Sequence, residues 1–264
     1  ATGGPISVDI STTAEEPDVT CFCAQVAEVE VDPETGEVKL KKFISAHDVG
    51  TIHNPLSHQG QIDGAVVLGM DEGEPWKARV RIARTAEEIQ AAAQSKYSLS
   101  PVNTIFRELE KLEGRFAYVG LPCQVHSLRK LQAVGHPAAC KISYVIGSYC
   151  GTILQFDAVR SFLRNNGVDD VSDVVDLQYR AGKWPGQMQV TLKSGEVIAL
   201  KKFYANYLIP FFMVDRCKLC TDLANEFADI ACGDAWAPVY EDRGLGWSLV
   251  MGRTTQGAAL LDAM

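Results

Sequence analysis

The sequence lacks long apolar runs and an excess of basic residues. Its 264 residues include no uninterrupted apolar run of the roughly 18 residues that cross a bilayer, so no membrane span is expected. The formal net charge is −8, which argues against a general nucleic-acid partner, because phosphate binding needs a basic surface. The first 20 residues hold no basic and apolar leader, so we expect no signal peptide and a cytoplasmic location.

Common nucleotide and metal motifs are also missing, since the chain has no GxGxxG, Walker or HExxH pattern. Cysteine, by contrast, is well represented. The eight cysteines are Cys21, Cys23, Cys123, Cys140, Cys150, Cys217, Cys220 and Cys232. Without an export signal, metal or cluster ligation is the more expected use than disulfide bonding. For Cys140 and Cys232 we expect small buried side chains without ligand roles.

Hydrophobic periodicity predicts an α/β fold. Residues 24–45 alternate around the turn DPETGE and predict an N-terminal β-hairpin, and residues 187–203 predict a second one turning at 194–195. Strand and helix patterns alternate between them, which favours βαβ units and a mixed, partly parallel sheet with flanking helices. The predicted helices are 85–94, 100–114, 124–135 and 156–167, and the predicted strands are 62–70, 79–84, 115–120, 141–150, 228–236 and 247–254.

The strongest local motif is the CxxC of RCKLCTD, formed by Cys217 and Cys220. Its spacing lets two thiolates face one metal or cluster, but it does not choose between zinc, an iron–sulfur cluster and a redox dithiol. Cys123 and Cys150 each follow a predicted strand, and loops after the carboxyl ends of parallel strands meet at one edge of a sheet. Together these cysteines form a candidate four-thiolate site that suits zinc or 4Fe–4S equally well.

Cys123 and His126, in LPCQVH, allow a second interpretation. A cysteine at a helix N-terminus gains thiolate character, so this pair could act as nucleophile and base. We rank this below cluster ligation, because the sequence reveals no acid that would orient the histidine.

Two segments that mix glycine, proline, aromatic and basic residues are predicted as loops, SKYSLSP and QYRAGKWPGQ. Such loops can bind a flat anionic cofactor, with Lys96 or Arg180 on phosphate, or they can be ordinary turns with a solvated charge. Asp234, in ACGDAW, leaves the same alternatives of a cofactor contact or a turn residue.

From about residue 61 to residue 264, the chain resembles the beta subunit family of coenzyme F420 hydrogenase and dehydrogenase. The segments that carry the resemblance are IDGAVVLGMDEGEPWKARVRIARTAEEIQAAAQSKYS, FAYVGLPCQVHSLRKL, SYCGT, YRAGKWPG, CKLCTDLANEFADIACGDAW and WSLVMGRTTQG. It implies an oxidoreductase subunit that passes electrons between a 4Fe–4S cluster, FAD and a two-electron partner such as the deazaflavin F420.

The same resemblance implies site residues and partners. The implied cluster ligands are Cys123, Cys150, Cys217 and Cys220. The implied flavin-side residues are Ser95, Lys96, Tyr97, Arg180, Gly182, Gly233 and Asp234. The implied partners are a redox protein, such as a ferredoxin or a hydrogenase or dehydrogenase subunit, with coenzyme F420 as a candidate substrate.

Residues 23–64 are similar instead to the molybdopterin-binding subunit of the xanthine dehydrogenase and aldehyde oxidase family. The similarity lies in AHDVG, NP and GQIDG, where Gln61 would match a pterin-contacting glutamine. That family's catalytic glutamate has no counterpart here, so no molybdopterin site is expected.

The two patterns cross inside GQIDG and predict a join between two genes. Residues 1–60 are expected to be a weakly attached hydroxylase-like hairpin segment, and residues 61–264 a flavin and iron–sulfur domain without the cysteine-rich and glycine-rich segments that open the F420 family. Three rival functions stay open: a zinc- or cluster-stapled domain that only binds a partner, a molybdenum hydroxylase fragment, and a non-functional chimera.

Overall fold

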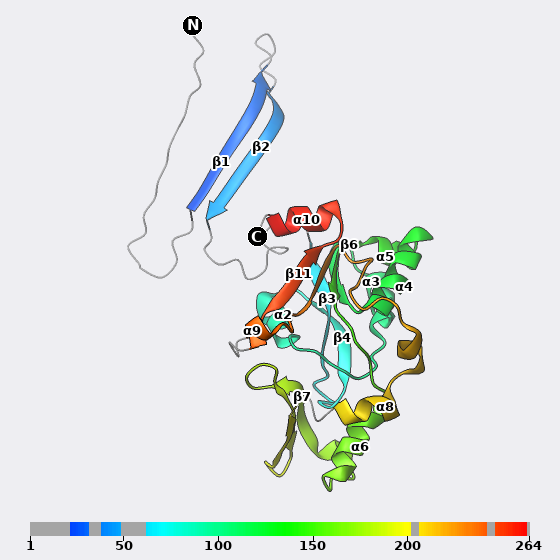
Figure 1. The fold of residues 1–264 in the computed structure, drawn as a ribbon. Helices are drawn as coiled ribbons and strands as arrows, with labels where there is room; N and C mark the ends of the chain where they lie inside the picture. Colours follow the sequence, from blue (N-terminus) through cyan, green and yellow to red (C-terminus); the bar gives the residue numbers. More distant parts are fainter. Residues whose placement is uncertain (1–21, 32–37, 49–61, 202–205, 242–245, 263–264) are drawn as a thin grey trace. The chain divides into compact units, whose positions relative to one another are not determined.

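The computed structural model describes residues 22–31, 38–48, 62–201, 206–241 and 246–262, in two compact units of residues 1–53 and 54–264 (Figure 1). In the first unit, β1 (Phe22–Val31) and β2 (Val38–Asp48) pair antiparallel, with a register shift between Glu28 and Val29. This confirms the N-terminal hairpin that alternation predicts. Within GQIDG, Gly60 and Gln61 lie outside the described residues, which resume at Ile62.

The second unit is built on a six-stranded sheet in the order β11-β10-β6-β5-β3-β4. Its strands are β3 (Gly64–Met70), β4 (Ala78–Ala83), β5 (Phe116–Gly120), β6 (Ile142–Ser148), β10 (Ile230–Asp234) and β11 (Ser248–Gly252). The four inner strands are parallel to one another, while β4 and β11 run antiparallel at the two edges. The predicted mixed, partly parallel sheet is confirmed.

Both faces of this sheet are covered, which explains the nearly continuous apolar sequences of its inner strands. Successive side chains of a strand point to opposite faces. Accordingly, Val66 packs into one core cluster while its neighbours Ala65 and Val67 pack into another. The first face carries η1 (Val102–Ile105), α3 (Phe106–Leu109), α4 (Pro122–Ala133) and α5 (Pro137–Cys140), and the second carries α2 (Ala86–Ala91) and α10 (Thr255–Asp262).

A smaller antiparallel sheet forms a separate core with α6 (Asp157–Asn165) and α8 (Ile209–Phe212) (Figure 1). Its strands are β7 (Val174–Ala181), β8 (Gln187–Leu192) and β9 (Val197–Lys201). The hairpin predicted to turn at residues 194–195 is confirmed, with Gly195 at φ +85°. The predicted loop QYRAGKWPGQ is wrong in its first half, because Gln178–Ala181 belong to β7. The short remaining elements are η2 (Val171–Asp173), η3 (Asn206–Leu208), η4 (Asp215–Leu219) and α9 (Pro238–Glu241).

Two further predictions need correction. The helix expected over residues 100–114 is only η1 followed by α3, which ends at Leu109. Cys140, expected to be buried, is exposed, because it lies at the end of the short helix α5, while Cys232 is half-buried. No helix in the described ranges is long and apolar enough to cross a membrane.

Candidate functional site

The carboxyl ends of three adjacent parallel strands, β5, β6 and β10, meet at one edge of the large sheet. Helix α4 begins just after β5, so Cys123 lies in the first helical turn. Cys150 follows the end of β6 by two residues. Because β5 and β6 are paired up to Gly120 and Gly147, the two cysteines leave the sheet at the same edge.

The CxxC motif reaches this edge from the chain before β10. Cys217 lies in η4, and the backbone N–H of Cys220 donates to the carbonyl of Cys217 at 3.3 Å. The connection to the sheet edge is direct, because the backbone N–H of Cys150 donates to the carbonyl of Leu223 at 3.0 Å. Three separate segments therefore bring four cysteines toward one place.

The cysteines are close enough to influence one another's ionisation. Burial raises the pKa of Cys150 to about 12, and the charges of Cys123, Cys217 and Cys220 contribute to this rise. Burial also raises the pKa of Cys123, with Arg216 opposing this effect and Cys217 adding to it. A bound cation would relieve this repulsion, since thiolates are the form that ligates metal.

The described residues contain no group of three or more Cys, His, Asp or Glu side chains arranged to hold a single metal ion. A single zinc ion needs every sulfur at about 2.3 Å from one point. A 4Fe–4S cluster places each sulfur on a different iron, so its four thiolates spread over a wider shell. Cys123, Cys150, Cys217 and Cys220 supply the four thiol donors that such a cluster uses, so the fit rests on the type of donor.

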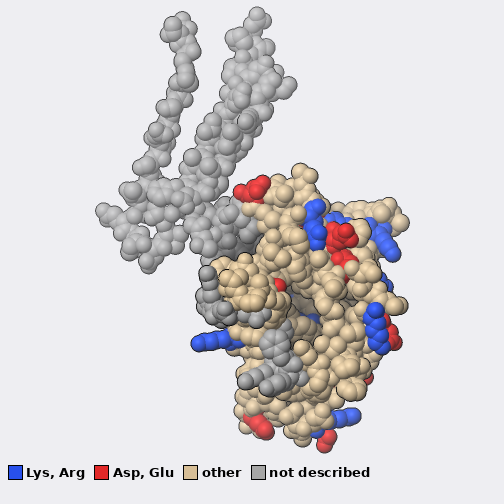
Figure 2. All heavy atoms as spheres, viewed as in Figure 1, with Lys and Arg blue, Asp and Glu red and all other residues tan. Residues whose placement is uncertain are grey.

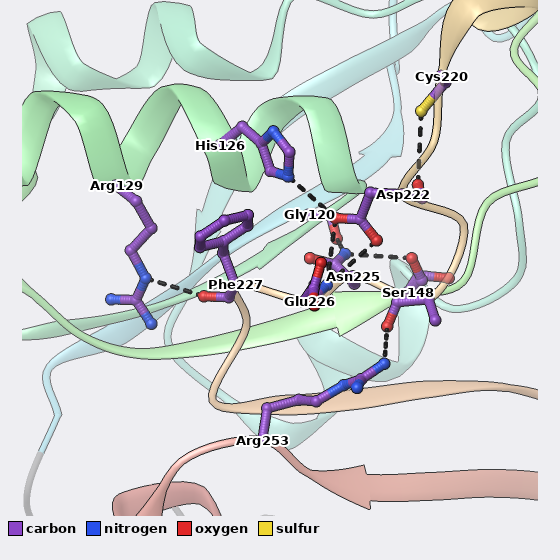
Figure 3. Close-up of polar contacts among 11 residues, drawn as sticks. Gly120, His126, Arg129, Ser148, Cys220, Asp222, Asn225, Glu226, Phe227 and Arg253 are labelled. Atoms are coloured by element: carbon purple, nitrogen blue, oxygen red, sulfur yellow. Dashed lines mark hydrogen bonds and ion pairs between the residues drawn. The ribbon is translucent and has the colours of Figure 1, made fainter.

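His126 lies one turn after Cys123 on α4, and its Nε2 is 2.9 Å from Oδ2 of the buried Asp222 (Figure 3). Its ring also packs edge-on against Phe227. Asp222 is the orienting acid that the sequence did not reveal. The nucleophile interpretation expects a lowered pKa for the Cys123 thiol at the start of α4. Burial instead raises this pKa, which does not favour that interpretation.

A second polar group lies around the end of β10, where Arg180 of β7 pairs with Asp234. This ion pair is largely shielded, with side chains only 13% and 28% exposed. Burial raises the pKa of Tyr97, opposed by the Arg180 charge and a Ser95 hydrogen bond, while Asp234 raises it. The structure thus brings together Ser95, Tyr97, Arg180 and Asp234, which were predicted from segments far apart in the sequence.

The other predicted flavin-side residues have structural roles in this conformation. Lys96 Nζ donates to the carbonyls of Ala92, Ala93 and Gln94 at the end of α2, and burial, with repulsion from Arg81, lowers its pKa to about 8. These three bonds use all the N–H groups of the ammonium, so a phosphate contact by Lys96 stays a prediction.

Gly182 and Gly233 are required by the backbone and by packing. Gly182 adopts φ +77°, which favours glycine. A Cβ on Gly233 would lie 2.4 Å from the ring of Tyr149. Their predicted contact with a cofactor stays a prediction.

Two tryptophans lie close in the sequence to Arg180 and Asp234. The rings of Trp184 and Trp236 are 4.8 Å apart, and Trp236 follows Asp234 by two residues. Trp184 Nε1 and Tyr149 Oη are buried and have no hydrogen-bond partner among the described residues. Figure 2 shows a hollow near the middle of one face, where most of the described surface is uncharged but some acidic and basic atoms are visible.

Two family models match the second unit. Residues 113–264, more than half of the chain, match the model for the C-terminal part of the coenzyme F420 hydrogenase/dehydrogenase beta subunit, and residues 51–107 match the model for its N-terminal part. The chain belongs to this family. It is therefore related to oxidoreductase subunits, as the resemblance implied. Residues 5–71 match a molybdopterin cofactor-binding domain, which confirms the second resemblance. This match overlaps that of the N-terminal F420 model over residues 51–71, which include the predicted join.

Curated relatives support the assignment. The chain is 30% identical over 241 residues to a coenzyme F420-dependent sulfite reductase of Methanocaldococcus jannaschii, covering 85% of this chain and 36% of that protein. It is 28% identical to the beta subunit of coenzyme F420 hydrogenase of Methanothermobacter thermautotrophicus, covering 82% of this chain and 74% of the relative. A stretch of 45 residues is 51% identical to the nicotine 6-hydroxylase large subunit of Paenarthrobacter nicotinovorans, covering 17% of this chain and 6% of that protein.

A solved structure shares the fold. It is the F420-reducing [NiFe] hydrogenase complex from Methanosarcina barkeri, which matches with a TM-score of 0.59 at 22% identity, covering 79% of this chain and 68% of the matched chain. At this identity, the match supports the architecture of the second unit rather than any particular residue role.

Proposed function

We propose that this chain is a redox subunit that passes electrons between a 4Fe–4S cluster, FAD and a two-electron carrier of the F420 type. The observation that carries the proposal is the convergence of four cysteines from three segments on the sheet edge that also ends in Asp234. Bound there, the cluster would supply one-electron transfer, and FAD would convert between one-electron and two-electron steps.

Different residues of the chain would bind the cluster and the flavin. Cys123, Cys150, Cys217 and Cys220 would hold the cluster as thiolates. Cys123, Cys150 and Cys217 are half-buried and Cys220 is exposed, so water would be excluded from only part of the cluster. On the flavin side, the guanidinium of Arg180 would hold anionic groups of the cofactor, with Asp234 fixing its orientation at the end of β10.

The aromatic residues fit the flat ring of a flavin. Trp184 and Trp236 pack against each other with ring centroids 4.8 Å apart, and such aromatic surface suits a cofactor with a flat ring. The buried donors of Trp184 and Tyr149, unpaired among the described residues, would gain hydrogen-bond partners from a bound ligand. Tyr149 lies between β6 and Cys150 in the sequence, and its ring packs on Gly233, which precedes Asp234.

The flavin half of the proposal is tested by substituting Arg180 with glutamine. Losing the charged hydrogen bonds, each of which contributes about 1.5–3 kcal/mol, should weaken FAD binding by about tenfold or more. The measurement is FAD affinity by fluorescence quenching, followed by electron transfer from reduced F420 to an artificial acceptor.

The matched control is Arg160→Gln on α6, where the guanidinium forms an ion pair with the exposed carboxylate of Asp157. Equal FAD affinity in the Arg180→Gln variant and the control would refute the assignment of Arg180. Failure of the unmodified chain to bind FAD would refute the flavin site altogether.

A further inference from the structure

Asn225 lies in the segment that joins the CxxC motif to β10, and it is fully buried at 0% exposure. Its φ is +56°, a left-handed conformation that asparagine tolerates better than most residues. A buried polar side chain in this backbone conformation needs a reason, because burying an amide without partners costs free energy.

The side-chain amide of Asn225 bridges the ends of two strands. Its Nδ2 donates to the carbonyl of Gly120 at 2.8 Å and to that of Ser148 at 3.2 Å (Figure 3). Gly120 is the last residue of β5 and Ser148 is the last residue of β6. The chain continues from these two residues to Cys123 and Cys150, so one amide fixes the points from which both cysteine segments depart.

The segment around Asn225 is held on both sides by further bonds. Before it, the carbonyl of Leu223 accepts the N–H of Cys150, and the carbonyl of Ala224 accepts Arg253 Nη2 at 3.0 Å. After it, the N–H of Glu226 donates to the Asp222 carboxylate, which in turn pairs with His126. The CxxC segment is thereby tied to α4 and to the loop after β6.

The packing around the amide is closely fitted. A Cβ added to Gly147 would lie 2.3 Å from Cγ of Asn225, so glycine at 147 provides the room that the amide occupies. The other amide atom, Oδ1, is buried and has no partner among the described residues. The two donated bonds therefore account for the placement of this side chain.

We propose that Asn225 is a positioning residue that sets the spacing of the three cysteine segments, so that four thiolates reach one cluster. This inference rests on the proposed function and assigns Asn225 no contact with the cluster. Without the amide, the ends of β5 and β6 and the CxxC segment lose their common tie, while the sheet keeps its own backbone pairing.

The test compares two substitutions that remove the amide donor in different ways. Asn225→Asp keeps the size and replaces the donor with an acceptor, and Asn225→Gly keeps the positive φ without a side chain. After anaerobic reconstitution with ferrous iron and sulfide, we expect both variants to lose iron to a chelator about 10-fold to 100-fold faster than the unmodified chain. The electron paramagnetic resonance spectrum of any residual reduced cluster should also change.

Two further variants separate positioning from general stability. Gly147→Ala should show the same iron loss, because it displaces the amide without altering it. Asn166→Asp is the matched control, since its Nδ2 also donates to a backbone carbonyl, that of Phe162 at the end of α6. The control should retain iron like the unmodified chain, and the far-ultraviolet circular dichroism of all variants should match it.

Normal iron retention in both Asn225 variants would overturn the inference. So would an equal loss of iron in Asn166→Asp, or iron loss that only accompanies loss of the folded signal. An unmodified chain that takes up no iron at all would instead refute the proposed function, which is a separate result.

Discussion

At the scale of single residues, two buried hydroxyl groups lie next to the predicted flavin-side residues Tyr97 and Arg180. Tyr179 and Ser98 share a hydrogen bond and are both almost fully buried. The ring of Tyr179 packs edge-to-face on Tyr97, with centroids 5.7 Å apart. Tyr179 immediately precedes Arg180 in β7, so this contact fixes the strand from which the guanidinium projects.

Burial raises the pKa of Tyr179 to about 12, although its hydrogen bond with Ser98 lowers it. The folded chain therefore keeps the tyrosine proton where the unfolded chain, with the ordinary tyrosine pKa of 10.0, has lost it. The contribution of protonated Tyr179 to the free energy of unfolding is fully present below about pH 10. It is lost as the pH rises from about 10 to about 12.

Tyr179→Phe should cost about 1–2 kcal/mol at neutral pH, because the buried Ser98 hydroxyl loses its partner. The substitution should also make the loss of stability between about pH 10 and about pH 12 shallower than in the unmodified chain. Urea unfolding of both proteins at neutral and alkaline pH measures this. Parallel losses of stability above about pH 10 would show that Tyr179 does not carry the effect.

At the scale of elements, Asp229 ties together the chain around the start of β10. Asp229 is 6% exposed. Its backbone N–H donates to the carbonyl of Val145 in β6 at 2.8 Å, and its Oδ2 accepts the N–H of Val145 at 2.8 Å. Its Oδ1 also accepts from Thr254 before α10 and lies 3.1 Å from Arg129 of α4.

Asp229→Ala should destabilise the second unit by about 3 kcal/mol, because it leaves Arg129 and the Val145 N–H without their buried partner. The control Asp157→Ala removes an exposed ion pair with Arg160 and should change stability by less than about 1 kcal/mol. Chemical denaturation measures both changes. Similar small losses in the two variants would show that Asp229 does not join these elements.

Much of the element pattern could be predicted from the sequence. The apolar runs of β3, β5 and β6 indicate strands buried on both faces, and the positive φ of Gly167 agrees with the predicted end of the helix over residues 156–167. The sequence does not predict β7, because the glycine and proline of YRAGKWPG favour a loop over the alternation of the residues before it. Local periodicity favours one helix over residues 100–114, whereas the structure has only η1 and α3 there.

At the scale of the whole molecule, the parallel sheet explains how residues far apart in sequence form one site. The positions of Cys123 and Cys150 after strands were visible in the sequence, so their common sheet edge could be predicted. The contacts of Asn225 with Gly120 and of His126 with Asp222 span about a hundred residues and depend on how the segment before β10 crosses that edge. No local pattern specifies that crossing, so the sequence does not indicate Asn225 or the pairing of His126 with Asp222.

The measurement that tests the central claim most directly is the iron and acid-labile sulfide content of cysteine variants after anaerobic reconstitution. Because cluster iron needs thiolate ligands, Cys217→Ser should lose most of the iron and the brown colour, whereas Cys140→Ser should keep both. Cys140 is a suitable control because it is exposed on α5, outside the three segments. The unmodified chain should contain close to four irons and four sulfides, the composition of a 4Fe–4S cluster. Equal iron content in the two variants, or bound zinc without sulfide, would contradict it.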